Sequence, residues 1–309
     1  MGTDDAIGAG ELSDAALARL ARASPSPLVP PARDDQAAVS AWRDTITAAW
    51  LDGDPSPEAC GHRADHVAGV PVLRSAPVAD GPLMVYLHGG GTVLGSPAVA
   101  VPITERLATG GLEVVSVQYR LAPEHPCPAA IDDAAAVVAA LAGDRPLVVA
   151  GDSAGANLAL SCALRDRDAG DHAIAGLVLF SPQVDHRPHR SSTDRSNDPQ
   201  RPSDLDAAGA RWFTDAYRGT LSVDDPMLSP LWADLAGLAP VLIQVGTIDT
   251  CFEQGARLAR RARNAGVDVT LDVWDGLWHT WHYHRDLPEA DRALAEAAAW
   301  ARRLSASGR

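Results

Sequence analysis

The sequence predicts an α/β fold in which a mostly parallel central sheet is covered by helices on both faces. From about residue 68 onward, short apolar runs alternate with stretches of helical periodicity, and such alternation is typical of parallel strands joined by crossover helices. One apolar run passes into a helical pattern through the glycine-rich turn GDSAG at 151–155. The 309 residues are 46% hydrophobic, which is enough to bury a large core.

The expected elements follow one another in a regular order. The expected strands are the runs VPVL, LMVYLH, VVSVQY, LVVAG, GLVLFSP, VLIQVG and VTLDVW. The expected helices between and after them lie at about 97–109, 128–143, 154–168, 251–265 and 287–305. Two amphipathic helices are expected earlier, at 11–23 and 34–50, on either side of the proline-rich loop SPSPLVPP.

Residues 184–206 interrupt this order because they are polar and rich in proline, serine and aspartate. They precede the patterned stretch AGARWFTDAYRG, so we expect an insertion that is partly loop and partly helix. The predicted division of the chain is a helical portion at 1–55, a core at 56–183, an insertion at 184–225 and a second part of the core at 226–309.

Composition and charge exclude several classes of function. A formal net charge of −14 repels phosphate backbones, so no nucleic-acid partner is expected. The stretch MGTDDAIGAGELSD lacks the features of a secretory signal, and no apolar run is long enough to span a membrane. Four scattered cysteines form no zinc spacing and are expected as reduced thiols of a cytoplasmic protein, although a disulfide stays open. These are Cys60, Cys127, Cys162 and Cys251.

The turn Gly-Asp-Ser-Ala-Gly places a lone serine, Ser153, between a strand pattern and a helix pattern. The pattern G-x-S-x-G is typical of a sharp turn that exposes a nucleophilic serine. Side chains in place of Gly151 and Gly155 would crowd such a turn. The alternative is an ordinary strand-to-helix turn in which the serine caps the helix.

A nucleophilic serine needs a histidine base that is held by a carboxylate. In sites of this type the acid and then the base follow the serine along the chain. Asp249 comes just after the strand VLIQVG, and His279 comes just after VTLDVW. Because the carboxyl ends of parallel strands meet at one edge of the sheet, we predict Ser153, Asp249 and His279 as the catalytic nucleophile, acid and base.

Other residues compete for these roles. Glu253 is the second choice of acid but lies one turn into a helix, and Asp275 precedes a glycine and has the character of a turn residue. His282 and His284 compete with His279, although they fall where the chain turns into loop and helix. A metal site in HTWHYH lacks carboxylate or cysteine partners at a known zinc spacing, so no metal is predicted.

The glycine-rich stretch His88-Gly89-Gly90-Gly91 ends the strand LMVYL. Glycines there let backbone N–H groups approach a substrate without an intervening Cβ. Such a loop supplies an oxyanion N–H together with the residue after the nucleophile, here Ala154. A flexible glycine turn is the alternative. We expect His88 to support the loop by hydrogen bonding rather than to transfer a proton, with Gly89 as its neighbour in that role.

Over about 80–305 the chain resembles the bacterial hormone-sensitive-lipase-like esterases, family IV of the α/β-hydrolase superfamily. The resemblance rests on HGGGTVLGS, YRLAPEHPCPAAIDDA, GDSAGANLAL, SPLWADLAGLAPVLIQVG and GLWHTW. It implies an α/β-hydrolase fold whose acyl pocket lies under a helical cap made of the N-terminal helices and the insertion. It also implies Gly90, Gly91 and Ala154 as oxyanion-hole donors, no cofactor, a small-molecule ester substrate and a possible homodimer.

The resemblance implies a serine carboxylesterase that hydrolyses short-to-medium acyl esters through an acyl-enzyme intermediate. An acyltransferase, cyclase or lactone hydrolase in a biosynthetic pathway would use the same triad, and this alternative stays open. A binding protein on an inactive hydrolase fold would require the loss of a triad residue, and none is lost.

The chain departs from the family's pattern at four positions. Thr92 stands where a bulky aromatic residue usually follows the glycines, and Cys127 also replaces an aromatic residue. Gln118 replaces an aspartate, and Trp278 beside the predicted base is larger than usual. These departures leave the triad intact, but they weaken the inference from the family's usual substrate preference to this chain. Two interpretations stay open for Trp212, Trp278 and Trp281: they line a pocket, or they fill the core.

Overall fold

The computed structural model describes residues 6–8, 12–21, 28–78, 81–187 and 207–306. Over these residues one sheet of nine strands has the order β1-β9-β8-β7-β6-β4-β5-β3-β2. The strands are β1 (Ala6–Gly8), β2 (Arg63–Val67), β3 (Val70–Arg74), β4 (Leu83–Leu87), β5 (Glu113–Val117), β6 (Leu147–Asp152), β7 (Ile174–Phe180), β8 (Val241–Gly246) and β9 (Val269–Trp274). The β2–β3 and β3–β5 pairs are antiparallel and the other pairs are parallel, which confirms the predicted fold class.

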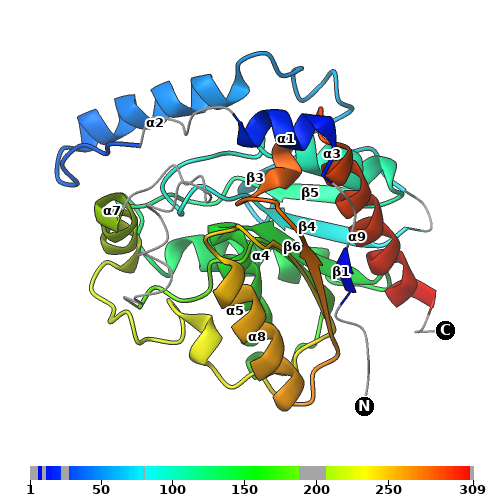
Figure 1. Cartoon of the computed structure of the whole chain (residues 1–309). Helices are drawn as coiled ribbons and strands as arrows, with labels where there is room; N and C mark the ends of the chain where they lie inside the picture. Colours follow the sequence, from blue (N-terminus) through cyan, green and yellow to red (C-terminus); the bar gives the residue numbers. More distant parts are fainter. Residues whose placement is uncertain (1–5, 9–11, 22–27, 79–80, 188–206, 307–309) are drawn as a thin grey trace.

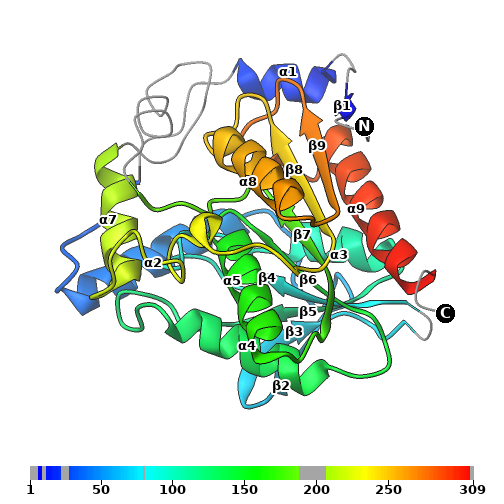
Figure 2. The same ribbon diagram turned by 90° about the horizontal axis from the view of Figure 1, so that it is seen from below.

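Helices cover both faces of this sheet (Figures 1 and 2). One face carries α3 (Val101–Thr109) and α9 (Pro288–Ala306), and the other carries α4 (Ala129–Leu141), α5 (Ala154–Ala169) and α8 (Phe252–Asn264). All five agree with the predicted helices to within a few residues. Two short 3₁₀ helices complete this part of the chain, η1 (Pro230–Trp232) and η2 (Trp281–Tyr283).

Strand β4 shows why the sequence folds into these layers. Its side chains alternate between the two faces, as the pleat of a strand requires. Leu83, Val85 and Leu87 pack in the core on the side of α4 and α5, whereas Met84 and Tyr86 pack in the core on the side of α3 and α9. Every residue of the strand is buried, because helices cover both faces, and the run is therefore continuously apolar.

Two strands were not predicted from the sequence. β2 is polar and mostly exposed, and it is held by pairing with β3 across a turn at Ala68 and Gly69. Both turn residues have positive φ, 51° and 79°, as a two-residue hairpin turn with the correct twist requires. Alanine is an unusual residue in that conformation, so the turn has no strong sequence signal. The three-residue β1 pairs in parallel with β9 at the edge of the sheet.

Three further helices lie outside these two layers. The predicted helices at 11–23 and 34–50 are present as α1 (Asp14–Leu20) and α2 (Gln36–Leu51), and α7 (Ala207–Arg218) lies in the second half of the predicted insertion. α2 and α7 contact each other through Trp42, which meets the rings of Trp212 and Phe213 edge-on. α1 packs elsewhere, against the segment that follows β9. Residues 188–206 of the predicted insertion lie outside the described residues, and the proposed domain boundaries stay a prediction.

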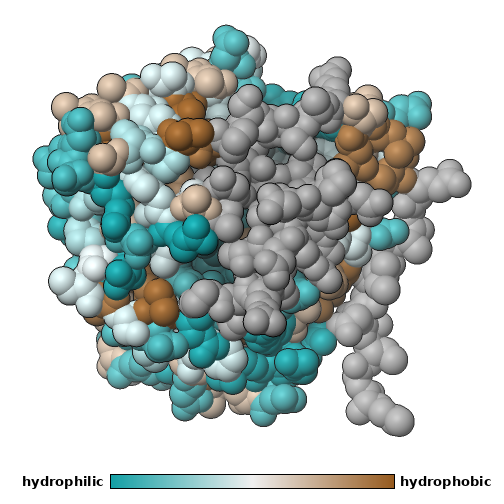
Figure 3. All heavy atoms as spheres, turned by 60° about the vertical axis from the view of Figure 1, so that its left-hand side comes forward, coloured by the Kyte–Doolittle hydropathy of each residue, from teal (hydrophilic) through white to brown (hydrophobic). Residues whose placement is uncertain are grey.

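Where Figure 3 colours the side chains on the side of α2 and α7, hydrophilic residues predominate and hydrophobic residues form separate groups. Among the described residues the large hydrophobic side chains that are exposed are Leu17, Val29 and Met227. None of the described helices combines the length and the apolar character needed to cross a membrane.

Candidate active site

Ser153 is the central residue of the turn between β6 and α5. It has φ 52° and ψ −118°, a conformation that non-glycine residues rarely adopt and that clusters at functional sites. A Cβ at Gly155 would collide with the carbonyl oxygen of Leu87, and one at Gly151 would collide with the backbone of Gly155. The two glycines therefore let the turn lie against the end of β4. The Ser153 side chain makes no capping hydrogen bond to α5, so it does not act as an ordinary helix cap.

The structure brings Ser153, His279 and Asp249 together in series. His279 Nε2 lies 2.9 Å from Ser153 Oγ, and His279 Nδ1 lies 2.8 Å from Asp249 Oδ1. Because an ionised carboxylate only accepts hydrogen bonds, Nδ1 carries the proton that Asp249 accepts, and Nε2 is left to accept from the serine hydroxyl. The Asp249 side chain is fully buried, whereas 26% of the His279 side chain is exposed. The base therefore reaches solvent while its acid does not.

The electrostatic environment prepares His279 to take up a proton. Burial alone would lower the pKa of His279, but the negative charge of Asp249, assisted by Cys251, raises that pKa well above its usual value. The charge of Asp249 thus stabilises the imidazolium form of His279 that would result from uptake of the serine proton.

The loops that carry the acid and the base are fixed by short hydrogen bonds. Asp249 Oδ1 also accepts from the backbone N–H of Cys251, at 2.7 Å. The N–H of Thr280, next to His279, donates to Ser181 Oγ at 3.0 Å, and Ser181 directly follows β7. The N–H of Ile248 donates to the carbonyl oxygen of Leu277 at 3.2 Å. The acid loop and the base loop are thereby joined to each other.

The glycine-rich loop is anchored to the nucleophile turn by a buried carboxylate. Asp152 accepts hydrogen bonds from the backbone N–H of Gly89 at 2.9 Å, from the Tyr86 hydroxyl at 2.7 Å and from the Tyr283 hydroxyl at 3.1 Å. Burial raises the pKa of Asp152, against the hydrogen bonds of the two tyrosines and Gly89, which lower it. A Cβ at Gly89 would collide with this carboxylate, so the contact requires glycine.

His88 contacts the backbone of the same loop. Its Nδ1 lies 2.8 Å from the carbonyl oxygen of Gly89. Its ring stacks on Tyr119 at 4.2 Å between ring centres, and the Tyr119 hydroxyl donates to the His88 carbonyl oxygen at 2.6 Å. Burial lowers the pKa of His88 to about 4, so the ring is neutral at physiological pH. None of the contacts described for the His88 ring involves Ser153, Asp249 or His279.

Three backbone N–H groups near Ser153 are available to a ligand oxygen. Within the described residues, no hydrogen bond uses the N–H of Gly90 or Gly91, both of which have positive φ. Ala154 is the first residue of α5, where N–H groups have no partner within the helix. β4 and β6 are neighbours in the sheet, so the loop after one strand and the turn after the other meet at the same edge.

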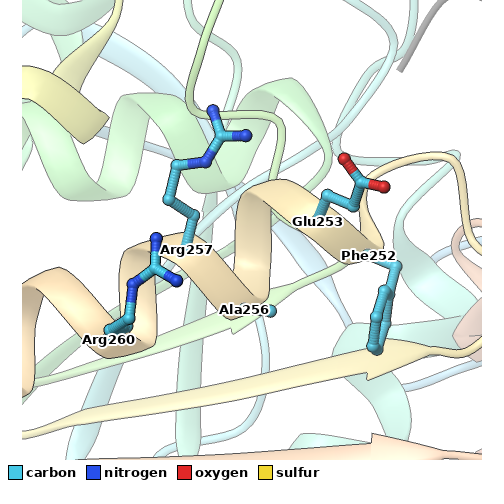
Figure 4. Close-up of a pocket in the computed structure, with 5 residues that line it drawn as sticks. All are labelled: Phe252, Glu253, Ala256, Arg257 and Arg260. Carbon is cyan, nitrogen blue, oxygen red and sulfur yellow. The ribbon is translucent and has the colours of Figure 1, made fainter. Parts of the chain in front are cut away.

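The competing acids do not reach His279 in the described contacts. Glu253 lies in the first turn of α8 and lines a cavity of about 240 Å³ on the outer side of that helix. Figure 4 shows its carboxylate on the same side of α8 as the guanidinium groups of Arg257 and Arg260. Asp275 accepts a hydrogen bond from Thr247 Oγ1 at 2.9 Å at the protein surface, as expected for a turn residue.

The competing histidines have other partners. His282 is completely buried, and its Nε2 lies 3.3 Å from Gln244 Oε1. Burial lowers the pKa of His282 well below its usual value. Trp278 Nε1–H donates a hydrogen bond to His284 Nε2 at 3.3 Å. In these positions neither ring is directed at Ser153.

One group of side chains in the described part of the chain is arranged so that it could hold a metal ion. It consists of Asp249, Cys251 and His279, whose ligand atoms all lie within 4.8 Å of one another. A metal there would displace the Nδ1 proton that Asp249 accepts, so the group would serve either a metal or the serine, not both. His282 and His284 are not part of it.

Sequence reasoning missed Asp152, Tyr86 and Tyr283. Asp152 stands inside the GDSAG motif, and its place directly before the predicted nucleophile was the only signal available in the sequence. Tyr86 lies in an expected strand and Tyr283 in the stretch between the last expected strand and helix, so no local pattern connects them. Of the three tryptophans with two readings, Trp278 and Trp281 are buried in a core cluster, whereas Trp212 is half-buried.

Comparison with known proteins agrees with this geometry. The family model for the alpha/beta hydrolase fold matches residues 84–283. An acetyl-hydrolase of Streptomyces hygroscopicus is 38% identical over 236 residues, which are 74% of this chain and 78% of that protein. An esterase of Acinetobacter venetianus is 35% identical over 231 residues, 72% of this chain and 75% of that protein.

The solved structures give the same result. The crystal structure of the hormone-sensitive-lipase homologue EstE7 from a metagenome library superposes with a TM-score of 0.76 and 31% identity, covering 85% of this chain and 93% of that one. The chain belongs to the hormone-sensitive-lipase-like family of the α/β-hydrolase fold, and it is a carboxylic ester hydrolase.

Proposed function

We propose that this carboxylic ester hydrolase is a serine esterase that cleaves short-to-medium acyl esters through an acyl-enzyme intermediate. The observation that carries the proposal is the series Ser153–His279–Asp249, with both hydrogen bonds below 3 Å. The names of the relatives, an acetyl-hydrolase and an esterase, support the reaction class.

In the first half of the reaction Ser153 Oγ attacks the ester carbonyl while His279 Nε2 takes its proton. Asp249 holds the imidazole in the required tautomer and stabilises its charged form. The N–H groups of Gly90, Gly91 and Ala154 hold the oxygen that becomes negative, and each donor of this kind lowers the barrier by about 2.7–4 kcal/mol. The protonated His279 then gives the proton to the leaving alcohol.

In the second half a water molecule attacks the acyl-enzyme, and His279 takes a proton from it. The tetrahedral intermediate collapses, the carboxylic acid leaves, and Ser153 recovers its proton from His279. His88 and Gly89 support the oxyanion loop in this proposal, because their contacts are with its backbone and with the neighbouring buried residues Tyr119 and Asp152.

We also infer that α2 and α7 belong to the cap over the acyl side of the site. A Cβ at Gly91 would collide with the ring of Phe213, which places α7 directly over the oxyanion loop. Arg43 of α2 donates to the carbonyl oxygens of Val93 and Ala122 at 2.7 and 2.9 Å. It also forms an ion pair with Glu124. This dense cover supports an acyl group of limited size.

The decisive experiment replaces the nucleophile. Ser153→Ala should abolish turnover of p-nitrophenyl butyrate and leave a folded protein, because only the residual catalysis from binding and the oxyanion hole, roughly 10³–10⁴ over water, remains. A fluorophosphonate should label Ser153 and no other serine of the wild-type protein, as read by peptide mass spectrometry. Unchanged turnover in the variant, or labelling at another serine, would refute the proposal. Product analysis with an added alcohol separates hydrolysis from acyl transfer.

A further inference from the structure

The short helix α1 packs against the segment that carries His279, although it comes from the opposite end of the chain. Figure 1 shows α1 beside the start of α9. Ala16 of α1 is completely buried in one cluster with Leu277, Trp278 and Trp281, which flank His279 on both sides. Leu12, just before the helix, lies against Gly276. α1 thus covers the outer side of the base loop, which we define as residues 275–287.

Two hydrogen bonds between Ser13 and the buried Glu289 hold α1 against the base loop. The backbone N–H of Ser13 donates to Glu289 Oε1 at 2.7 Å, and the Ser13 hydroxyl donates to Oε2 at 2.8 Å. Glu289 lies in the first turn of α9, directly after the base loop, and only 4% of it is exposed. A buried carboxylate whose two oxygens are both hydrogen-bonded fixes the position of its partner firmly.

The same serine also begins the helix. Ser13 Oγ accepts from the N–H of Ala16 at 3.2 Å, so it is the N-cap of α1. At the other end of α1, Arg19 pairs with Asp286 in the base loop at 2.7 Å. This second pair is largely exposed at the carboxylate, and pairs of that kind contribute little. The Ser13–Glu289 contact is therefore the main polar link between α1 and the base side.

The base loop is also held on its inner side within the described contacts. The N–H of Thr280 donates to Ser181 Oγ, the Tyr283 hydroxyl donates to Asp152, and Arg106 of α3 donates to the carbonyl oxygens of His282 and His284. Thr280 has a positive φ of 53°, which is an unfavourable backbone conformation for a β-branched residue. A strained turn keeps its geometry only where the surrounding structure determines it. α1 supplies such a constraint from outside, and it does so without a described contact to Ser153, Asp249 or the His279 ring.

We propose that α1 is a brace for the catalytic base and that Ser13 and Glu289 are positioning residues for His279. The brace keeps the base loop at the place where His279 Nε2 lies within hydrogen-bonding distance of Ser153 Oγ. This inference rests on the proposed serine-esterase function. A displacement of about 1 Å at a reacting group reduces the rate by about a hundredfold, so a small loosening of the loop affects turnover more than it affects substrate binding.

The test compares Glu289→Gln and Ser13→Ala with the wild type, using p-nitrophenyl butyrate. In Glu289→Gln the amide oxygen can accept from the Ser13 N–H and the amide NH₂ can donate to Ser13 Oγ, so both hydrogen bonds lose their charge assistance and weaken while the cap of α1 is kept. In Ser13→Ala the hydrogen bond of the hydroxyl is lost outright. We expect kcat to fall by about ten- to a hundredfold with KM unchanged. The rate at which a fluorophosphonate labels Ser153 should fall by the same factor. Ser13→Thr keeps the hydroxyl, so it should show the wild-type kcat and the wild-type rate of labelling at Ser153.

Two further measurements separate positioning from mere stability. The proton shared by His279 Nδ1 and Asp249 should give a downfield NMR signal that broadens or moves in Glu289→Gln. Asp166→Asn is the matched control, because both oxygens of Asp166 accept backbone N–H groups, from Ala173 at 3.1 Å and Ile174 at 3.2 Å, and no described contact joins Asp166 to the base loop. This control should keep the wild-type kcat and the wild-type NMR signal.

The brace is refuted if Glu289→Gln and Ser13→Ala keep the wild-type kcat and labelling rate, even where their melting temperature falls. It is also refuted if Asp166→Asn loses as much activity as they do. Should Glu289→Gln fail to fold, Ser13→Ala and its threonine counterpart decide the question by the same readouts. Failure of the proposed function would give a different result, because the fluorophosphonate would then not label Ser153 even in the wild-type protein.

Discussion

The nucleophile side and the base side of the site are held in different ways. Ser153 and the oxyanion loop follow β6 and β4, which are neighbours at the centre of the sheet, and Asp152 joins them inside the core. His279 lies on a loop after β9, near the edge of the sheet. That loop is covered by α1, and its polar link, Ser13 to Glu289, joins residues 276 positions apart.

In the proposed serine esterase, this difference shows which parts of the site are fixed by residues that are close together in the chain. The nucleophile and the oxyanion donors act through backbone geometry, so a glycine-rich strand end and a tight turn fix them within a few residues. The base acts through a side chain that must stay mobile enough to exchange protons between two partners. Its position is set by contacts around the loop, and these come from several elements, among them α1, α3, α9 and the segment after β7.

The largest effect expected on the base side comes from His279→Gln. Glutamine cannot take up the serine proton, so turnover should fall nearly as far as in the nucleophile variant, by about 10⁴ or more. His282→Gln is the matched control, because His282 is buried beside Gln244 three residues further along. It should lower stability more than turnover. Steady-state kinetics on p-nitrophenyl butyrate with both purified variants checks this, and the reverse result would move the base to His282.

An intermediate effect is expected on the nucleophile side from Asp152→Asn. The amide nitrogen would face one of three donors, from Tyr86, Tyr283 or Gly89, and a buried donor left unpaired costs about 1–3 kcal/mol. We therefore expect a lower free energy of unfolding in urea together with a reduced kcat. Tyr283→Phe removes a single donor and should show a smaller change in both. A loss of kcat in Asp152→Asn without any loss of stability would contradict the view that this side is fixed from within the core.

The sequence is informative where function depends on local backbone geometry. The turn at Ser153 and the loop at Gly90 and Gly91 need glycines at fixed spacing, and such spacing is visible in a single sequence. Asp249 and His279 were predicted as well, because each follows a strand and parallel strands present their carboxyl ends at one edge. The structure brings these side chains together.

Other parts of the molecule could not be derived from the sequence, for physical reasons. The hairpin of β2 and β3 turns through Ala68, which has a positive φ. Alanine rarely adopts this conformation, so the residue type does not predict the turn. The periodicity at 11–23 predicts an amphipathic helix, but not which surface its apolar side covers. Long-range partners such as Ser13 and Glu289 have no spacing rule, because their contact depends on the whole fold.

The smallest effect we predict is a change of substrate specificity. It sharpens the comparison of the two sides because it involves neither Asp152 nor the Ser13–Glu289 contact. Phe213 of α7 lies over Gly91, so Phe213→Leu should open space beside the oxyanion donors while Ser153 and His279 stay in place. The ratio of kcat/KM for p-nitrophenyl octanoate to that for p-nitrophenyl acetate should rise by about tenfold, the order of discrimination that a few methylenes provide. Trp212→Leu changes the neighbouring ring, which instead donates to the carbonyl oxygen of Pro31 at 2.8 Å, and should leave that ratio nearly unchanged. A chain-length profile that is identical in wild type and Phe213→Leu would show that α7 does not limit the acyl group, and the cover over the site would then be set by other residues.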